Sequence, residues 1–327
     1  MNADGTPGCS PDVRPAEPAD RAHCAPLQRG FIGLGVMGAP MAGHLLEALP
    51  AGARLHVTAR RPGSAQPLVA RGAVWHESAR SVAEASDVIV LMLPDLPDVR
   101  ALLDGPQGLL AGVRSPTLVV ICSTVSPEGV RTLDAEVRER TGGLARLVDA
   151  PVSGGEEGAR EGRLSVMVGG ESADAAIACD VLAPTGVSVH LGPLGAGQIA
   201  KACNQMIVAA TVVALGEASV LAERAGLDVA ALLDLLGLGF AGSRILDVKK
   251  KRFAEHDHSP SGAARFMVKD LTFATDEAER TGTATPQLDT LRTIFTDLTA
   301  AGLGDQDTAV VQAFIENQTR HETPEGP

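Results

Sequence analysis

Aromatic side chains are scarce in this sequence, which has no tyrosine and only 2% Phe and Trp among 327 residues. This scarcity leaves no set of rings on which nucleic-acid bases could stack. A net charge of −12 at pH 7 also repels any polyphosphate backbone. We therefore expect no nucleic-acid partner, and we attribute the acidity to solubility.

Metal-type cysteine pairs and long uncharged apolar runs are missing as well. The number of cysteines is odd and none belongs to a C-x-x-C pair, so we expect neither a disulfide framework nor a metal. This cysteine usage fits a reducing cytoplasm. No stretch of about 18 residues is both apolar and uncharged, and we expect no membrane partner. The five cysteines are Cys9, Cys24, Cys122, Cys179 and Cys203.

The length of the chain and the order of its apolar segments predict two domains. The first 28 residues contain five prolines and no apolar core of a secretory signal. Short apolar runs then alternate with amphipathic ones, which is typical of parallel strands crossed by helices. We expect a disordered tail at 1–28, an α/β Rossmann domain with a doubly wound parallel sheet at 29–194, an all-helical substrate and dimerisation domain at 195–320, and a flexible end at 321–327.

The strands of the first domain are predicted from nearly continuous apolar runs, which indicate burial on both faces of a sheet. They lie at 31–32, 55–57, 87–91, 117–121, 146–149, 165–168 and 187–190. Helical periodicity follows, at 196–225, 228–236, 271–279 and 287–300. The first of these helices contains no proline and could span roughly 40 Å, enough to bridge both domains.

A glycine motif separates the first strand from a helix-like run. Gly33-Leu34-Gly35-Val36-Met37-Gly38 has the form G-x-G-x-x-G. Its glycines permit a tight turn, a close approach of the backbone to a pyrophosphate, and close helix packing. Such a motif is weak in isolation, and a glycine turn without a ligand is the alternative. Its strand-turn-helix context favours a dinucleotide site.

Two arginines follow the second strand, where an acidic residue would mark a ribose 2'-hydroxyl. Arg60 and Arg61 match a 2'-phosphate instead, because a guanidinium can bind it with two parallel hydrogen bonds. NADP(H) is therefore favoured over NAD(H) as the cofactor. Dual use stays open, as does the alternative that both arginines only solvate a loop.

Three further blocks give the sequence a family resemblance. The runs are FIGLGVMGAPM at 31–41, DAPVSGG at 149–155, and GAGQ at 195–198 followed by Lys201, Asn204 and Gln205. Over about residues 30–273 the chain resembles the β-hydroxyacid dehydrogenase family, which includes 3-hydroxyisobutyrate dehydrogenases, tartronate semialdehyde reductases and glyoxylate/succinic semialdehyde reductases.

The resemblance implies roles for residues at the ends of strands. Met92, Leu93 and Pro94 would line the nicotinamide ribose, and Thr124 would reach both cofactor and substrate. Ser123 and Thr124 could alternatively cap the next helix. Lys269, in the segment FMVKDL at 266–271, would approach the nicotinamide side of the cofactor, with Asp270 fixing the segment. An exposed charge pair that opens a helix is the alternative there.

Ser153-Gly154-Gly155 offers a hydroxyl and unobstructed backbone N–H groups, an arrangement suited to a carboxylate. A small carboxylate-bearing molecule is the expected substrate. Glu156 stands where many relatives have a neutral residue, so it could disfavour a dianion or point to solvent. Gly262 replaces an aromatic residue of many relatives, which suggests a roomier or differently shaped pocket.

Lys201 is the candidate catalytic residue. Gln198 and Gln205 can share its helix face, and Asn204 and Gln205 would orient the substrate or the lysine. Several relatives have Asn at position 205. The Gln205 of this chain matches the tartronate semialdehyde reductase branch instead. Partial desolvation would lower the lysine pKa and let it donate a proton near neutral pH. A solvated lysine is the alternative.

These patterns predict an NADPH-dependent reductase, working reversibly, that converts a small carboxylate-bearing aldehyde or keto acid to the hydroxy acid. An NAD-dependent 3-hydroxyisobutyrate-type dehydrogenase, an imine reductase-like enzyme and a non-catalytic cofactor-binding module remain alternatives. The apolar stretch 207–221 needs more burial than one cleft provides, so we expect a homodimer or homotetramer.

Overall fold

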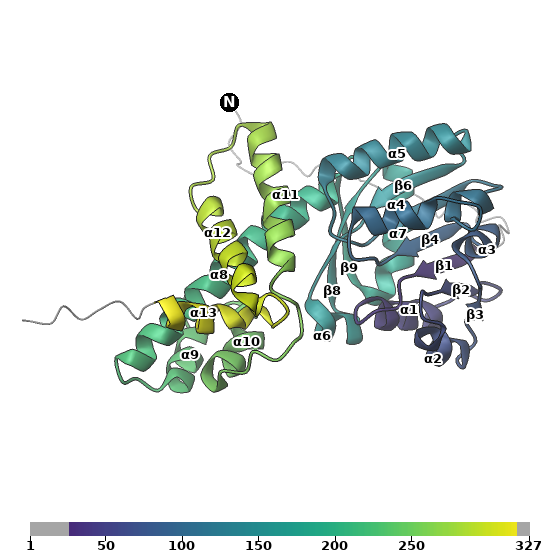
Figure 1. Ribbon diagram of the computed structural model, residues 1–327. Coiled ribbons are helices and arrows are strands. Elements are labelled where there is room, and N and C mark those ends of the chain that lie inside the picture. Colours follow the sequence, from purple (N-terminus) through teal and green to yellow (C-terminus); the bar gives the residue numbers. More distant parts are fainter. Residues whose placement is uncertain (1–25, 319–327) are drawn as a thin grey trace, which may run out of the picture.

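The computed structural model describes residues 26–318, and the predicted tails at 1–28 and 321–327 lie almost wholly outside this range (Figure 1). Six parallel strands form most of one sheet in the order β3-β2-β1-β4-β5-β6. Their central members are buried along their whole length, which explains their apolar composition. The strands are β1 (Arg29–Ile32), β2 (Leu55–Thr58), β3 (Val74–Trp75), β4 (Val88–Leu91), β5 (Thr117–Ile121) and β6 (Ala145–Asp149).

The far end of the sheet departs from the parallel arrangement that the sequence predicts. Strands β7 (Val152–Ser153) and β8 (Leu164–Gly169) pair in antiparallel fashion, β8 also runs antiparallel to β6, and β9 (Gly186–Gly192) runs parallel to β8. Only the short helix α6 (Gly155–Arg160) separates β7 from β8. This link is too short for the crossover that a parallel pair requires.

Helices cover both faces of the sheet, as a doubly wound fold requires. One apolar core lies beneath α1 (Gly38–Glu47) and α7 (Ser172–Leu182), and it includes Phe31 and Met41. The other lies beneath α3 (Ala79–Glu84), α4 (Leu96–Leu103) and α5 (Pro127–Thr141). The predicted α/β architecture is confirmed, with the antiparallel end as its correction.

The second half is helical and is built around the 29-residue helix α8 (Ala196–Arg224), which runs out of the sheet half (Figure 1). A separate core contains Val212, Phe253, Leu271 and Phe295. Two helices, α10 and α13, were not predicted, and α11 begins five residues earlier than predicted. The remaining helices are α9 (Val229–Gly237), α10 (Arg244–Glu255), α11 (Phe266–Thr281), α12 (Leu288–Leu298) and α13 (Val311–Gln318).

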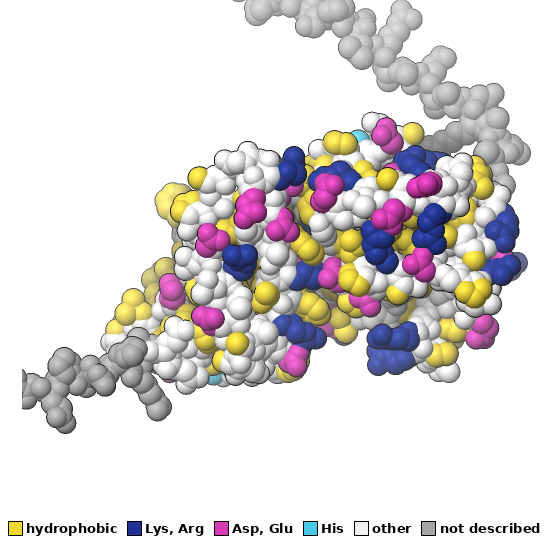
Figure 2. Space-filling view, turned by 45° about the horizontal axis from the view of Figure 1, so that its top comes forward, with side chains coloured by type: hydrophobic (Ala, Val, Ile, Leu, Met, Phe, Trp, Pro, Cys, Tyr) yellow, Lys and Arg dark blue, Asp and Glu magenta, His cyan; other side chains and the backbone are white. Residues whose placement is uncertain are grey.

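Among residues 26–318, α8 is the one helix long and apolar enough to cross a membrane. Half of its most apolar window is buried inside the structure, and the core helix of a globular domain has the same composition. Ile207 and Leu221 remain exposed on α8. That a homo-oligomer covers them stays a prediction. On the face in Figure 2, acidic and basic side chains are intermixed.

Candidate cofactor and active site

The glycine motif forms the turn between β1 and α1. A Cβ on Gly33, whose φ is +105°, would overlap the carbonyl oxygen of Met92, and one on Gly38 would overlap the carbonyl oxygen of Gly33. A Cβ on Gly35 would meet no atom within 4 Å. The space over Gly35 is therefore open, and no side chain caps the N-terminus of α1. Open space beside uncapped N–H groups fits a pyrophosphate.

The other predicted cofactor residues lie at the same edge of the sheet, after β2, β4 and β5. Arg60 and Arg61 are exposed, and within the described chain neither guanidinium has a hydrogen-bond or ion-pair partner. Met92, Leu93 and Pro94 follow β4, and the Leu93 N–H donates to Ser123 Oγ at 2.9 Å. The capping alternative for Ser123 and Thr124 is wrong, because Ser126 caps α5.

The predicted substrate loop needs its glycines for conformational reasons. Gly154 and Gly155 have φ values of 135° and 62°, which side-chain-bearing residues rarely adopt. Ser153 Oγ donates to Asn204 Oδ1 of α8 at 3.3 Å, so the loop contacts the helix that carries the lysine. Glu156 pairs with Arg160 one turn on, and this partner compensates its charge.

Lys201 is 8% exposed, and among the described residues its ammonium has no hydrogen-bond or ion-pair partner. Burial lowers the pKa of Lys201 to about 8; the nearby carboxylate of Asp270 raises it in part, and the ammonium of Lys269 lowers it further. The solvated-lysine alternative does not fit this burial. A buried amine with a pKa near neutrality can both donate and accept a proton.

A chain of polar contacts runs beside Lys201. Gln205 Nε2 donates to Asp270 Oδ2 at 2.6 Å, and Asn204 Nδ2 donates to Gln205 Oε1 at 2.9 Å. Asp270 Oδ1 lies 3.1 Å from Lys269 Nζ, an ion pair without hydrogen-bond geometry. Lys269 Nζ also donates to the carbonyl oxygen of Thr124 at 2.6 Å. The contacts thus connect α8, α11 and the end of β5.

Lys269 and Asp270 are not the exposed charge pair of the alternative interpretation. They lie near the start of α11, where Asp270 is buried and Lys269 Nζ sits 5.1 Å from the ring centre of Phe273. Sequence patterns assign no role to Asp149 and place Gln198 only on the helix face of Lys201. The structure places both residues between the sheet and the first turn of α8. The position of Asp149 at the end of a strand was the available signal.

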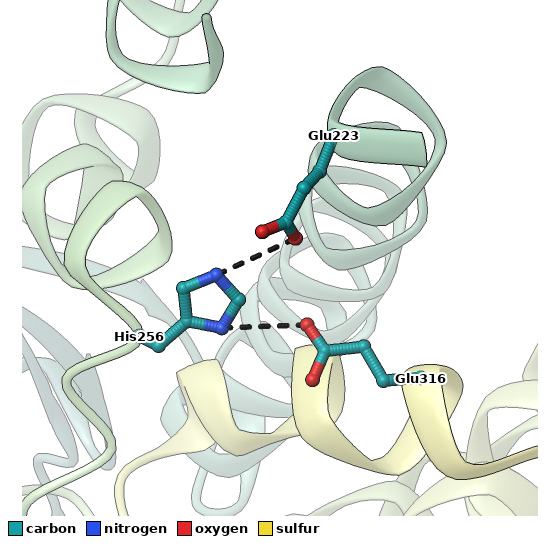
Figure 3. Close-up of side chains that lie close together, drawn as sticks. All are labelled: Glu223, His256 and Glu316. Atoms are coloured by element: carbon teal, nitrogen blue, oxygen red, sulfur yellow. Dashed lines mark ion pairs between the residues drawn. The ribbon is translucent and has the colours of Figure 1, made fainter. Parts of the chain in front are cut away.

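A second polar cluster lies at the other end of α8 (Figure 3). His256 stands between two carboxylates, with Nε2 3.5 Å from Glu223 and Nδ1 3.3 Å from Glu316. The ligand atoms are close enough to hold a metal ion. However, the two ring nitrogens face different carboxylates, so the ring bridges Glu223 and Glu316 rather than turning toward one shared ion position.

Comparison with known proteins matches both halves. Residues 28–192 match the family model of the NAD binding domain of 6-phosphogluconate dehydrogenase. Residues 195–314 match the model described as the NAD-binding region of NADP-dependent 3-hydroxyisobutyrate dehydrogenase.

Individual relatives match along most of the chain. The 2-hydroxy-3-oxopropionate reductase of Escherichia coli K12 is 39% identical over 90% of the chain and 99% of its own length. The NAD-dependent L-serine dehydrogenase of Pseudomonas aeruginosa is 37% identical over 88% of the chain and 98% of its length. A solved structure of Mycobacterium tuberculosis 3-hydroxyisobutyrate dehydrogenase with L-serine has a TM-score of 0.75 and 32% identity, covering 88% of this chain and 99% of that one.

Proposed function

Because the chain belongs to the β-hydroxyacid dehydrogenase family, we propose that it is an NADPH-dependent reductase of a small carboxylate-bearing aldehyde or keto acid. The protein is an NAD(P)-dependent oxidoreductase acting on CH–OH and C=O groups. The proposal concerns the preferred coenzyme, the substrate class and the proton donor.

In the proposed reaction, each group of residues has one task. The loop at Ser153, Gly154 and Gly155 binds the substrate carboxylate through its hydroxyl and N–H groups. The bound nicotinamide coenzyme supplies hydride to the carbonyl carbon. Lys201 donates a proton to the carbonyl oxygen, which yields the hydroxy acid, and accepts it back when the reaction runs as an oxidation.

The observation that carries this proposal is the burial of Lys201 without a partner. A structural lysine in a protein interior is normally paired, because an unpaired buried charge is costly. Lys201 instead keeps a free ammonium beside the polar contacts of Asn204, Gln205 and Asp270. Desolvation brings its pKa close to working pH, as a general acid requires.

Lys201→Met tests the role of the proton donor, since methionine fills a similar volume without an amine. We expect kcat for aldehyde reduction to fall by about 10²- to 10⁴-fold, while NADPH still binds, as measured by fluorescence titration. In the wild type, kcat for reduction should fall as the pH rises through about 8, because Lys201 loses its proton there. Wild-type turnover in Lys201→Met would refute the assignment.

Arg60 and Arg61 support the preference for NADPH, because two exposed and unpaired guanidinium groups suit a 2'-phosphate. The double variant Arg60→Ala/Arg61→Ala should lose about 10- to 100-fold in kcat/KM for NADPH, the cost of one or two charge-assisted hydrogen bonds. Its kcat/KM for NADH should stay within about twofold. Equal losses with both coenzymes would favour the solvated-loop interpretation.

The first substrate to test is tartronate semialdehyde (2-hydroxy-3-oxopropionate). Gln205 matches the residue that the tartronate semialdehyde reductase branch of the family has at this position. Glyoxylate, succinic semialdehyde and methylmalonate semialdehyde complete the panel, each with NADPH and NADH. Turnover confined to methylmalonate semialdehyde with NADH would favour the 3-hydroxyisobutyrate alternative. Reduction of cyclic imines alone would favour an imine reductase, and cofactor binding without any turnover would favour a binding module.

A further inference from the structure

Asp149 ends strand β6 with a side chain that is fully buried. Its Oδ1 accepts a hydrogen bond from the Gly195 N–H at 2.7 Å, and its Oδ2 accepts one from the Gln198 N–H at 2.7 Å. Within residues 26–318 no cation forms an ion pair with this carboxylate, and the Arg131 guanidinium acts on it only from a greater distance. Both of its oxygens are therefore committed to the first turn of α8.

Gln198 makes a second set of bonds from that turn. Its side chain is 1% exposed, its Nε2 donates to the carbonyl oxygen of Ser123 at 2.9 Å, and its Oε1 accepts from the Val125 N–H at 3.0 Å. These two partners flank Thr124, whose own carbonyl oxygen accepts from Lys269. Gln198 thus fixes the strand end where the proposed cofactor and substrate meet.

Glycines allow this close approach of α8 to the sheet. A Cβ on Gly197 would overlap the carbonyl oxygen of Met167 and lie 2.8 Å from Asp149 Oδ2. A Cβ on Gly169 would crowd Asp149 Oδ1 and the Gly197 N–H. The carboxylate is therefore enclosed by main chain on several sides. Lys201 follows Gln198 by three residues, about one turn, so its position depends on how that turn is held.

We propose that Asp149 and Gln198 are positioning residues that hold Lys201 in line with the reacting carbonyl by bonding the first turn of α8 to the ends of β5 and β6. The inference rests on the proposed proton donor and adds two residues whose side chains are almost fully buried beneath it. Four hydrogen bonds to main-chain groups set the helix relative to the sheet. Their loss would let the lysine shift, and a displacement of about 1 Å can cost about 100-fold in rate.

The energetics of Asp149 argue against a purely stabilising role. Burial raises the pKa of Asp149 to about 6, and the hydrogen bonds from Gly195 and Gln198 lower it only in part. An ionised group is thus retained at a cost where a neutral residue would be less costly to bury. What the carboxylate offers over an amide is two acceptor oxygens, one for each N–H of the turn.

The test compares Asp149→Asn and Gln198→Met with a matched control, Asp174→Asn. Asp174 is also a buried carboxylate with two hydrogen bonds, from Arg146 Nε at 2.8 Å and Nη2 at 2.9 Å, but none of them reaches α8. For each full-length variant we would measure kcat, KM for NADPH, Tm, and the solvent deuterium isotope effect on kcat.

We expect Asp149→Asn and Gln198→Met to lower kcat by about 100-fold, with KM for NADPH within about twofold. The solvent isotope effect should increase in both, because proton donation from a displaced lysine becomes rate-limiting. Asp149→Asn and Asp174→Asn should both lower Tm, because each leaves a buried hydrogen-bond donor without an acceptor, but Asp174→Asn should keep the kcat and the isotope effect of the wild type. If the role of Asp149 and Gln198 were purely structural, their variants would behave like Asp174→Asn, with a lower Tm but an unchanged kcat and isotope effect.

Lys201→Met separates failure of this inference from failure of the proposed function. If Lys201→Met retains turnover, the proton donor itself is wrong. If Lys201→Met is inactive while Asp149→Asn and Gln198→Met keep the wild-type kcat and isotope effect, the proposed function stands and the positioning role is overturned. Gln198→Met provides the answer should Asp149→Asn fail to fold.

Discussion

The two ends of α8 are held by opposite kinds of interaction. At its first turn, Asp149 and Gln198 are buried and bond to main-chain groups. At its last turn, Glu223 meets His256, and both side chains are largely exposed (Figure 3). His256 is also the only non-glycine residue with positive φ in the described chain, at 50°.

This difference indicates where the helix must be rigid. Hydrogen bonds to an enclosed carboxylate are not screened by salt, whereas exposed ion pairs contribute about 0 to 1 kcal/mol. The firmly held end carries Lys201. The loosely held end belongs to the helical half, where apolar packing of the middle of α8 against α10, α11 and α13 fixes the helix without needing precise polar contacts.

The largest effect is expected when a methyl group is added to α8 where it packs closely. The same Gly→Ala change can be made near its firmly held first turn and further along the helix. Gly197→Ala should destabilise the protein by about 3 kcal/mol and lower kcat by about 100-fold, because its Cβ overlaps main chain of β8. Gly216→Ala makes the same change on the same helix against the side chain of Val311. For Gly216→Ala, urea unfolding should show a smaller loss of stability than for Gly197→Ala, and steady-state kinetics should show an unchanged kcat. A normal kcat in Gly197→Ala would contradict the rigid first turn.

A pH dependence of stability provides the next test. The pKa of Asp149 rises on folding from 3.8 to about 6, so its contribution to stability is fully present below about pH 4 and is lost as the pH rises through about 6. Between pH 5 and 7 the wild type should lose about 1 to 2 kcal/mol of unfolding free energy relative to Asp149→Asn. Urea titrations at the two pH values measure this change. If the difference in unfolding free energy between the wild type and Asp149→Asn is the same at both pH values, the pKa of Asp149 is not raised by folding.

The smallest effect is expected at the loosely held end. His256→Asn removes both ion pairs and keeps a residue that tolerates the left-handed conformation. We expect a loss below about 1 kcal/mol that shrinks further at high salt, and a kcat within about twofold of the wild type. A large loss of kcat would show that this end also positions the lysine and would remove the contrast.

Most of the sheet half could be predicted from the sequence because its signals are local. Buried strands appear in the sequence as apolar runs, and the spacing of Gly33 and Gly38 predicts the turn between β1 and α1. Strand β3 has only two residues, too few for a pattern. The direction of β8 depends on its partner strands, and no property of its own residues encodes that pairing.

The helical half was harder to predict for a physical reason. Helix α10 is dense in charge and has only two buried side chains, Leu246 and Phe253, so it lacks the high apolar content that marks the predicted helices. Ser243, which caps it, was the available signal. At the site, local patterns predict that Lys201 lies on a long helix with Gln198 and Gln205, and the structure has all three buried on α8. The partners of Asp149 are N–H groups 46 and 49 residues away, which side-chain patterns do not specify.

The three glycines of the dinucleotide turn divide into two classes with different tolerance to mutation. Gly33 and Gly38 are required by the fold itself, because a methyl group at either would strike the backbone. Gly35 faces open space, so only a bound ligand would limit the size of a side chain introduced there. Selection for solubility or heat resistance would therefore not detect changes at Gly35. A bulky residue at position 35 would give a folded protein that no longer binds the coenzyme, so that substrate binding can be measured on its own.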